Sequence, residues 1–125
     1  MKTIDTQAFH SWVQQYGAAW ESRDPKAAAA LFSRDAEYYW TPFDPPRRGH
    51  EGIMAAWAGA VGGQKDIRFR FEVIGVSGRR GCAHWNARFT AVPAGGPVEL
   101  DGILSAEFES EGLCRVFREW WHLKG

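Results

Sequence analysis

Seven of the 125 residues in this chain are tryptophan, and their spacing constrains the fold more than any other feature. Trp12 and Trp20 share one helical stripe, whereas Trp40, Trp85 and Trp121 fall on the apolar side of strands. A small domain seldom closes solidly around so many large rings, and more often arranges them around a hollow. The sequence therefore predicts a pocket for an apolar or aromatic small molecule.

Length and charge balance narrow the class of protein. A chain of this length forms one domain, which we take as residues 1–125, and it can bury a core without disulfides or metal. Fifteen basic and fifteen acidic residues cancel, so we expect no nucleic-acid partner and no membrane surface as a partner. No apolar signal segment or run of roughly 18 apolar residues is found, so we expect a cytoplasmic protein.

The residues that commonly hold metals or cofactors lack the required spacing. Cys82 and Cys114 do not form a C-x-x-C pair, and they are interpreted as packed thiols. The four histidines show no H-E-x-x-H pattern, and no glycine-rich loop leads from a strand into a helix. We therefore expect no metal, no cofactor and no nucleotide.

Three helices are predicted in the N-terminal half. Apolar residues repeat on one face over residues 6–21, which indicates an amphipathic helix. Asp24 and Pro25 supply an N-cap and a first-turn proline, so we expect an alanine-rich helix that continues through Phe32. Ile53, Trp57 and Val61 recur every four residues before two glycines, which predicts a third helix over residues 49–61.

The rest of the chain has the period of strands. Residues 37–41 are aromatic and are followed by prolines, which favours one short strand. Alternating runs at 67–73, 83–89 and 98–108 are separated by turn signals, and a last strand is expected over residues 113–123. The order predicts an α+β domain whose helices cover one face of a curved antiparallel sheet.

One acidic residue interrupts the apolar side of these strands. Alternation places Glu119 on the same face as Leu113, Phe117 and Trp121, with Arg115 as the only base there. A carboxyl group among aromatic rings loses hydration, which raises its pKa and suits it to act as a general acid or base. Alternatively, Glu119 pairs with a tyrosine hydroxyl, a tryptophan N–H or Arg115 and only orients the pocket.

Several short stretches match a known superfamily in order and spacing. They are Tyr16 and Trp20 on the first helix, residues 22–25 (SRDP), 30–36 (ALFSRDA), 48–53 (RGHEGI) and 117–122 (FREWWH). In these the chain resembles the nuclear transport factor 2-like superfamily, in particular its SnoaL-like branch of polyketide cyclase relatives. The resemblance implies a cone-shaped α+β barrel in which three N-terminal helices pack on a curved, mostly antiparallel sheet that encloses a pocket. It also implies no obligatory cofactor and, commonly, a homodimer.

The resemblance extends only partly to ketosteroid isomerase, the best understood enzyme of this fold. Tyr16 falls where that enzyme has its hydroxyl donor, but Trp40 stands in place of the catalytic base and the second acid falls near Leu104. Steroid isomerase activity in that form is therefore not expected. Nor does the sequence provide the inward-facing pair of acids with an arginine that an epoxide hydrolase of this fold needs.

Our leading hypothesis is a protein that binds a hydrophobic, cyclic, carbonyl-bearing small molecule. If it is an enzyme, it catalyses cofactor-independent proton transfer of the isomerase, cyclase or dehydratase type, with Glu119 as base or acid and Tyr16 polarising the carbonyl. A local, structural hydrogen bond of the Tyr16 hydroxyl is the alternative. The expected aromatic lining comprises Tyr16, Trp20, Tyr38, Trp40, Trp57, Phe71, Trp85, Phe89, Phe117 and Trp121.

The second hypothesis is a non-catalytic ligand-binding or dimerisation module of the same fold. In that case the polar side of the strands forms the dimer surface; its residues are His84, Asn86, Arg88, Asp101 and Glu107. The loop around Arg47 and Arg48 either attracts an anionic ligand to the pocket mouth or is a solvated loop.

Overall fold

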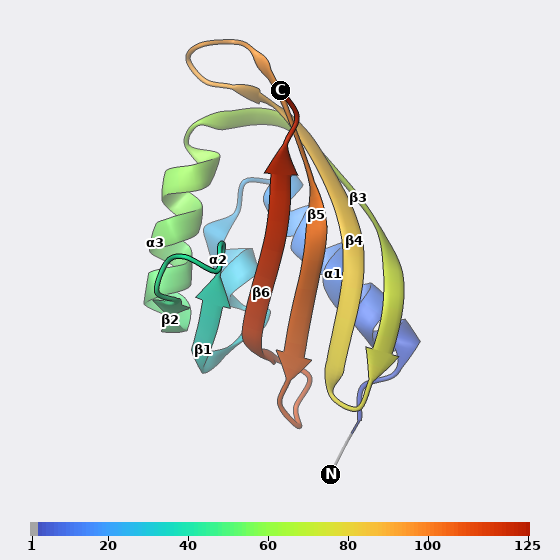
Figure 1. Ribbon diagram of the computed structural model, residues 1–125. Coiled ribbons are helices and arrows are strands. Elements are labelled where there is room, and N and C mark those ends of the chain that lie inside the picture. The colour runs from blue at the N-terminus through green and yellow to red at the C-terminus, as the bar shows by residue number, and fades with distance from the viewer. Residues whose placement is uncertain (1–2) are drawn as a thin grey trace.

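A computed structural model describes residues 3–125, and it places three helices on one side of a single six-stranded sheet (Figure 1). The helices lie behind the sheet in this view, with α3 beside the edge formed by β1 and β2. In chain order the elements are α1 (Thr6–Glu21), α2 (Pro25–Ala29), β1 (Phe32–Tyr39), β2 (Arg47–Arg48), α3 (Gly49–Val61), β3 (Gln64–Ser77), β4 (Arg80–Ala91), β5 (Pro97–Phe108) and β6 (Cys114–Leu123).

The helix boundaries follow from capping. The Asp5 side chain accepts a hydrogen bond from the Ala8 amide at 2.7 Å, and the Asp24 side chain accepts one from the Ala27 amide at 3.1 Å. Each carboxylate satisfies an amide that has no partner within the helix. The predicted bounds of α1 and α3 are confirmed, because their apolar faces and end signals agree.

The second helix is shorter than predicted. It ends at Ala29, and Phe32 is already the first residue of β1. The Leu31 carbonyl accepts a hydrogen bond from the Cys114 amide at 3.0 Å, and β1 then runs parallel to β6. This pairing with a strand from the end of the chain, which local sequence does not reveal, extends the predicted short strand toward the N-terminus.

The sheet is mixed, with the strand order β2-β1-β6-β5-β4-β3. Every neighbouring pair is antiparallel except β1 with β6. The predicted α+β class and mostly antiparallel sheet are confirmed. The predicted barrel is not closed, because β2 and β3 are the two edges of the sheet and do not pair with each other.

The alternation of buried and exposed side chains along β6 is broken once. The prediction that Arg115 lies on the apolar side of this strand is therefore wrong. The register with β5 shifts between Cys114 and Val116, so Arg115 is a bulge residue. Arg115 therefore turns outward and binds Glu107 at 3.1 Å, whereas Cys114 takes the buried position. Leu113 lies before the strand. Beyond the bulge, Phe117 and Glu119 are buried on the helix-covered side as predicted.

A close approach between strands shapes the sheet next to these residues. A Cβ atom on Gly102 would lie 2.9 Å from both Cα and Cβ of Trp121, its partner on β6. Real Cβ atoms do not approach so closely, so only glycine lets the two strands come together here. The Trp121 side chain thereby lies across β5 on the concave side of the sheet.

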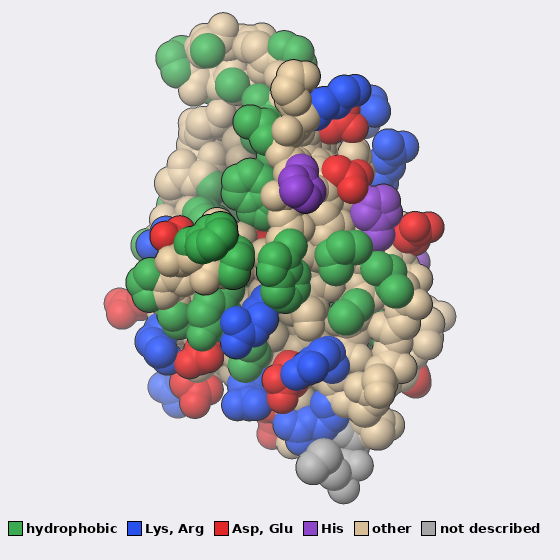
Figure 2. Space-filling model, in the orientation of Figure 1, with side chains coloured by type: hydrophobic (Ala, Val, Ile, Leu, Met, Phe, Trp, Pro, Cys, Tyr) green, Lys and Arg blue, Asp and Glu red, His purple; other side chains and the backbone are tan. Residues whose placement is uncertain are grey.

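The opposite, convex side of the sheet is the face seen in Figure 2. His84 binds Asp101 at 2.8 Å, and Asn86 donates to Glu99 at 2.9 Å and to Asp101 at 3.1 Å. The predicted polar side of the strands is thus a network of mutually paired groups. Hydrophobic side chains gather beside it in the middle of this face.

Candidate functional site

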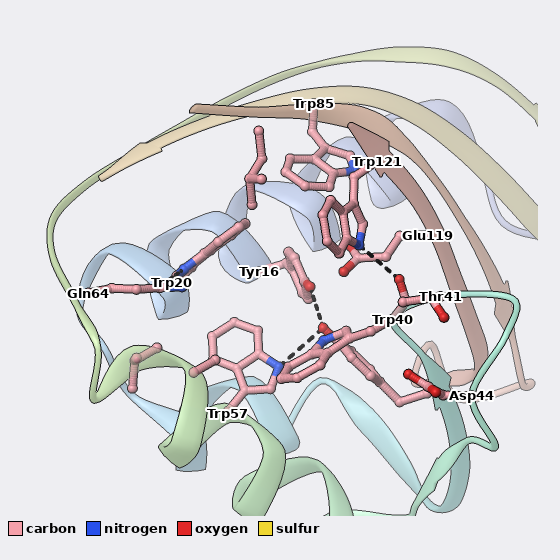
Figure 3. Close-up of a pocket in the computed structure, with 14 residues that line it drawn as sticks. Tyr16, Trp20, Trp40, Thr41, Asp44, Trp57, Gln64, Trp85, Glu119 and Trp121 are labelled. Atoms are coloured by element: carbon pink, nitrogen blue, oxygen red, sulfur yellow. Dashed lines mark hydrogen bonds between the residues drawn. The ribbon is translucent and has the colours of Figure 1, made fainter. Parts of the chain in front are cut away.

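A cavity of about 200 Å³ lies between the helices and the concave side of the sheet (Figure 3). Its wall combines residues from α1, β1, α3, β3, β4, β5 and β6 with three from the loop after β1. The lining residues are Tyr16, Trp20, Tyr38, Trp40, Thr41, Asp44, Trp57, Ala60, Val61, Gln64, Trp85, Leu100, Glu119 and Trp121.

Both predicted catalytic residues and six of the nine other predicted lining residues meet at this cavity. Phe71, Phe89 and Phe117 do not line it. Phe71 packs against His10 at 4.9 Å between ring centroids, and Phe89 lies at a separate surface groove with Lys124. Phe117 is fully buried beneath the cavity, stacked on Tyr38 at 4.8 Å.

Sequence reasoning missed six lining residues. Ala60, Val61, Gln64 and Leu100 are aliphatic or polar, and the search for aromatic rings overlooked them. Thr41 and Asp44 belong to the loop after β1, where alternation gives no guidance. Asp44 is an exposed second carboxyl group at the cavity, whereas Glu119 is the buried one.

The carboxyl group of Glu119 is buried without a partner. The residue is 8% exposed, and the structure of residues 3–125 gives its side chain no hydrogen bond and no ion pair. Loss of hydration therefore raises its pKa from 4.5 to about 8. Of the partners in the alternative interpretation, Arg115 binds Glu107 and the two tyrosine hydroxyls bind each other. Within residues 3–125, no tryptophan N–H donates to the Glu119 carboxyl group.

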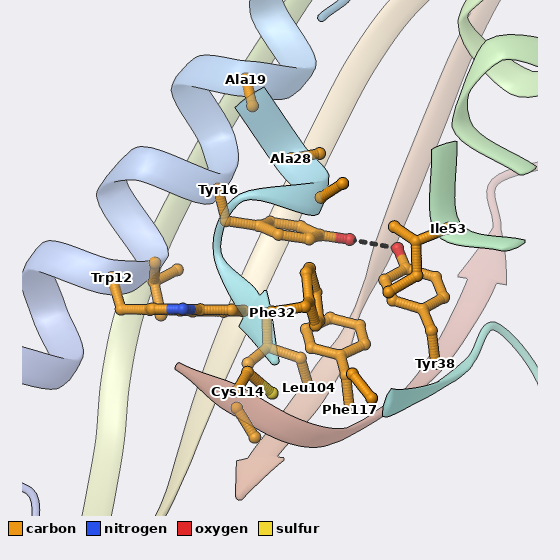
Figure 4. Close-up of a cluster of buried hydrophobic side chains, with 14 of the residues drawn as sticks. Trp12, Tyr16, Ala19, Ala28, Phe32, Tyr38, Ile53, Leu104, Cys114 and Phe117 are labelled. Atoms are coloured by element: carbon orange, nitrogen blue, oxygen red, sulfur yellow. Dashed lines mark hydrogen bonds between the residues drawn. The ribbon is translucent and has the colours of Figure 1, made fainter. Parts of the chain in front are cut away.

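Two tyrosine hydroxyls from different elements form a pair at the cavity (Figure 4). The hydroxyl groups of Tyr16 and Tyr38 are 2.6 Å apart, and the Trp57 indole N–H donates to the Tyr38 hydroxyl at 3.3 Å. Either tyrosine can donate within the pair, so one of the two hydroxyl protons is left for another acceptor. Burial, and then the nearby Glu119 charge, raise the pKa of both tyrosines well above the usual value, which keeps them protonated.

Three indole rings of the wall, including that of Trp57, are held in place by their N–H groups. Trp20 donates to the Gln64 side-chain oxygen at 2.8 Å, and Trp121 donates to the Trp40 carbonyl at 2.9 Å. The Trp20 ring also meets those of Trp57 and Trp85 at centroid distances of 6.4 and 5.7 Å. These contacts fix the rings as walls, so Trp40 and Trp57 line the cavity and do not fill it.

The arginine loop beside the cavity is tied to the protein surface. The Arg47 guanidinium lies 5.6 Å from the centroid of the Trp40 ring, and Arg48 binds Glu37 at 2.7 Å. The His50 ring contacts the Phe32 carbonyl at 2.8 Å. Within the part of the chain that the structure describes, no group of three or more metal-ligating side chains is found. No helix among those residues is long and apolar enough to cross a bilayer.

The raised pKa of Glu119 predicts a pH-dependent stability. The folded-state value of about 8 exceeds the ordinary 4.5, so the folded chain holds the extra proton between these values and its stability falls as pH rises through that window. Glutamine cannot ionise, so Glu119→Gln should gain stability over the wild type by a few kcal/mol between about pH 5 and about pH 9. Urea unfolding at both pH values measures the difference. Parallel pH profiles for the two chains would mean that the carboxyl group is hydrated.

The comparisons with known proteins agree with this architecture. A family model described as a SnoaL-like domain matches residues 13–116. A comparison with curated proteins finds no significant match. Among solved structures, one similar chain is described as the epoxide hydrolase/cyclase-like enzyme SalBIII, with a role in pyran ring formation in the polyether salinomycin. The likeness has a TM-score of 0.81 at 17% sequence identity over 94% of this chain and 93% of the other, so it concerns the fold. With the family model matching most of its length, this chain belongs to the SnoaL-like domain family.

Proposed function

We propose that this protein binds a hydrophobic cyclic carbonyl compound and catalyses cofactor-independent proton transfer on it, as isomerases and cyclases do. The observation that carries the proposal is a buried carboxyl group without a partner, facing a cavity with a hydroxyl pair on another wall. A carboxyl group in such a place destabilises the fold when it ionises. We infer that this cost is offset by chemistry that the group performs on a bound molecule.

The reaction uses two walls of the cavity. The Glu119 carboxylate removes a proton from the carbon next to the ligand carbonyl, and the electron pair of that C–H bond moves into the enolate. The hydroxyl of Tyr16 donates to the enolate oxygen, where the negative charge gathers, while Tyr38 and Trp57 hold Tyr16 in place. The protonated Glu119 then returns the proton to another atom of the ligand, which restores the carboxylate.

The proton affinity of Glu119 suits both halves of this cycle. With a pKa of about 8, the group is mostly protonated at neutral pH, and a minor fraction is ionised. A base whose pKa lies near the working pH can take a proton and release it again without a large penalty in either direction.

The fold likeness to an epoxide hydrolase/cyclase-like enzyme supports ring closure among the candidate reactions. A ring-closing step needs one group that takes a proton from the attacking atom and one that gives a proton to the departing oxygen. Glu119 and the tyrosine pair supply these two functions from different walls. Ketosteroid isomerase chemistry in its usual form is disfavoured, since Trp40 stands in place of the catalytic base and the position of the second acid falls near Leu104.

Proton abstraction can be tested without knowing the natural substrate. A panel of aromatic and terpenoid ketones is screened by quenching of tryptophan fluorescence, and each ligand is then incubated with the protein in D₂O. We expect wild-type protein to exchange the α-proton of a bound ketone, with a rate that rises with pH and levels off above about pH 8. Glu119→Gln should bind the same ketone with little change in affinity but lose the exchange, as followed by proton NMR. Exchange that persists in this variant assigns the base to another group.

The hydroxyl donor is tested by a matched pair of tyrosine variants. Tyr16→Phe removes the proposed donor to the enolate, and such a loss typically lowers the rate by about 100-fold to 1000-fold. Tyr39→Phe is the control, because the Tyr39 hydroxyl contacts Glu37 at 3.3 Å and lies outside the cavity lining. The α-proton exchange rate of the bound ketone is the measurement. An unchanged rate in Tyr16→Phe would transfer the donor function to Tyr38.

We also propose that the chain forms a homodimer through the convex side of the sheet. Trp120 is 46% exposed and Ile74 is 58% exposed on this side, where solvated residues are expected. Alternation places Tyr39, Cys82 and Ile103 on the same side, and with Trp120 and Ile74 they define an outer apolar band. Figure 2 shows hydrophobic side chains gathered in the middle of this face. Paired charges such as Arg80 with Glu107 border the band, as at the rim of an interface. This surface equally supports the alternative of a non-catalytic dimerisation module.

The dimer is tested by a charge placed in the outer apolar band. Trp120→Glu should weaken self-association by at least about thirty-fold, because a tryptophan at the centre of an interface commonly contributes 2 kcal/mol or more. Phe43→Glu is the control, since Phe43 is 92% exposed but lies in the loop between β1 and β2. Sedimentation velocity over a concentration series measures both. A wild-type chain that stays monomeric throughout the series contradicts the proposal.

A further inference from the structure

The composition of the cavity wall suits a positively charged ligand. Five indoles and two phenol rings line it, together with two acidic residues, Asp44 and Glu119. Among the described residues that line the cavity, none is lysine, arginine or histidine. The face of an indole ring carries a negative electrostatic potential, so the rings and the carboxyl groups attract the same kind of charge.

The rings of this wall are inclined to one another as in a cage (Figure 3). Trp20 makes an interplanar angle of 65° with Trp57 and of 62° with Trp85. The rings of Tyr38 and Trp40 are inclined by 72°. Aromatic rings that surround a space from several directions are the usual site of quaternary ammonium groups in proteins.

One indole of the wall already contacts a cation from outside the cavity. The Arg47 guanidinium lies over the Trp40 ring at 5.6 Å from its centroid, and Arg47 is not a lining residue. Because Arg47 is exposed, water screens its charge from the interior. Within residues 3–125, the other four indoles of the cavity have no guanidinium or ammonium group over their rings. Their faces are therefore available to a ligand.

Glu119 lacks the counter-ion that a buried carboxyl group needs in order to ionise. The residue is 8% exposed, and within residues 3–125 its side chain forms no ion pair. Asp44 is exposed, so water screens its charge. A positive charge that enters the cavity therefore acts mainly on Glu119, where the low polarity of the surroundings makes the attraction strong.

We propose that the ligand of this cavity is a cation, namely a carbonyl compound that carries a quaternary or protonated amine near the reacting carbon. This inference rests on the proposed function, since it concerns the same cavity and the same base. The ammonium group lies among the indoles and beside the Glu119 carboxylate, while the carbonyl oxygen meets the tyrosine pair. Because the same carboxylate takes the proton from carbon, the charged nitrogen must lie close to that carbon.

A cationic ligand also activates the base. In the empty cavity Glu119 has a pKa of about 8, so it is mostly protonated at neutral pH. A positive charge beside the carboxyl group favours its ionised form, and the proton leaves to the solvent as the ligand binds. The cation therefore generates the carboxylate that the reaction needs, whereas a neutral ligand of the same shape does not.

The test uses two probes of the same shape that differ by one atom. Choline carries a trimethylammonium group, and its neutral isostere dimethylbutanol has a carbon atom in place of the charged nitrogen. Neither probe ionises near neutral pH, so a difference between them reports the ligand charge alone. We expect the wild type to bind choline at least about tenfold more tightly than the alcohol. Isothermal titration calorimetry measures both affinities.

The same titrations count the proton that leaves Glu119. Near neutral pH, choline binding should release close to one proton and the alcohol none, as measured in two buffers with different enthalpies of ionisation. The raised pKa of Tyr16 and Tyr38 keeps both hydroxyls protonated, and Asp44, the remaining titratable group of the lining, is exposed to water. The released proton is therefore that of Glu119.

Matched variants complete the experiment. Glu119→Gln should lose most of the preference for choline and release no proton, because glutamine cannot form the ion pair. Glu111→Gln makes the same chemical change at an exposed residue of the turn between β5 and β6, outside the cavity lining, and should behave as the wild type. The proton count is measured on the wild-type chain, so the test stands even if Glu119→Gln does not fold.

The outcomes separate this inference from the proposed function. Absence of choline binding, or equal affinities for the two probes with no proton released, overturns the inference. If the wild type still exchanges the α-proton of a neutral ketone, the proposed function is left intact. If that exchange is absent as well, both are overturned.

Discussion

The organisation of this protein depends on a carboxyl group that has been taken out of water without an opposite charge beside it. Glu119 is buried on the concave side of the sheet, and its pKa rises to about 8 because of that burial. A buried acid normally acquires a hydrogen-bonded or ionic partner. Here the neighbouring strand supplies a hydrophobic side chain, because Leu104 on β5 lies directly opposite Glu119. The free lone pairs of the carboxyl group are therefore directed to whatever enters the cavity.

A cavity among so many aromatic rings requires that the rings do not collapse into it. In this fold the N–H groups of three indoles provide the restraint, since Trp20 donates to Gln64, Trp57 to Tyr38 and Trp121 to the Trp40 carbonyl. Each bond ties a ring to a different segment of the chain, so a ring cannot turn inward without losing its acceptor. Gly102 also helps to shape the cavity. Because it has no side chain, β6 can approach β5 closely, and Trp121 then lies over the concave side of the sheet.

The architecture can be predicted from the sequence wherever the decisive interactions are local. The α1 and α3 bounds, the capping by Asp24 and the SnoaL-like resemblance are confirmed. Errors arose where a distant strand decides the outcome. Phe32 joined the sheet because β1 pairs with β6, and the Arg115 bulge reversed the alternation before Glu119.

The candidate site shows a second limit of pattern reasoning. Alternation predicts which face of a strand a side chain occupies, but not how far along a curved sheet it lies from a cavity. Phe71 and Phe89 were therefore assigned to the cavity wall from their alternation, although they sit beyond its reach on β3 and β4. Asp44 was overlooked for the converse reason, since a loop has no period to interpret.

The carboxyl group and the tyrosine hydroxyls in the cavity respond differently to the same burial. Desolvation raises the pKa of Glu119 into the neutral range, where it exchanges its proton readily, and raises the pKa of Tyr16 and Tyr38 farther from that range. Ionisation of Glu119 strengthens the second effect, because its negative charge opposes ionisation of the tyrosines. The tyrosine pair consequently remains a hydrogen-bond donor in the state in which Glu119 is ionised. In the proposed reaction, Glu119 therefore moves the proton while the hydroxyl pair stabilises the charge that the movement creates.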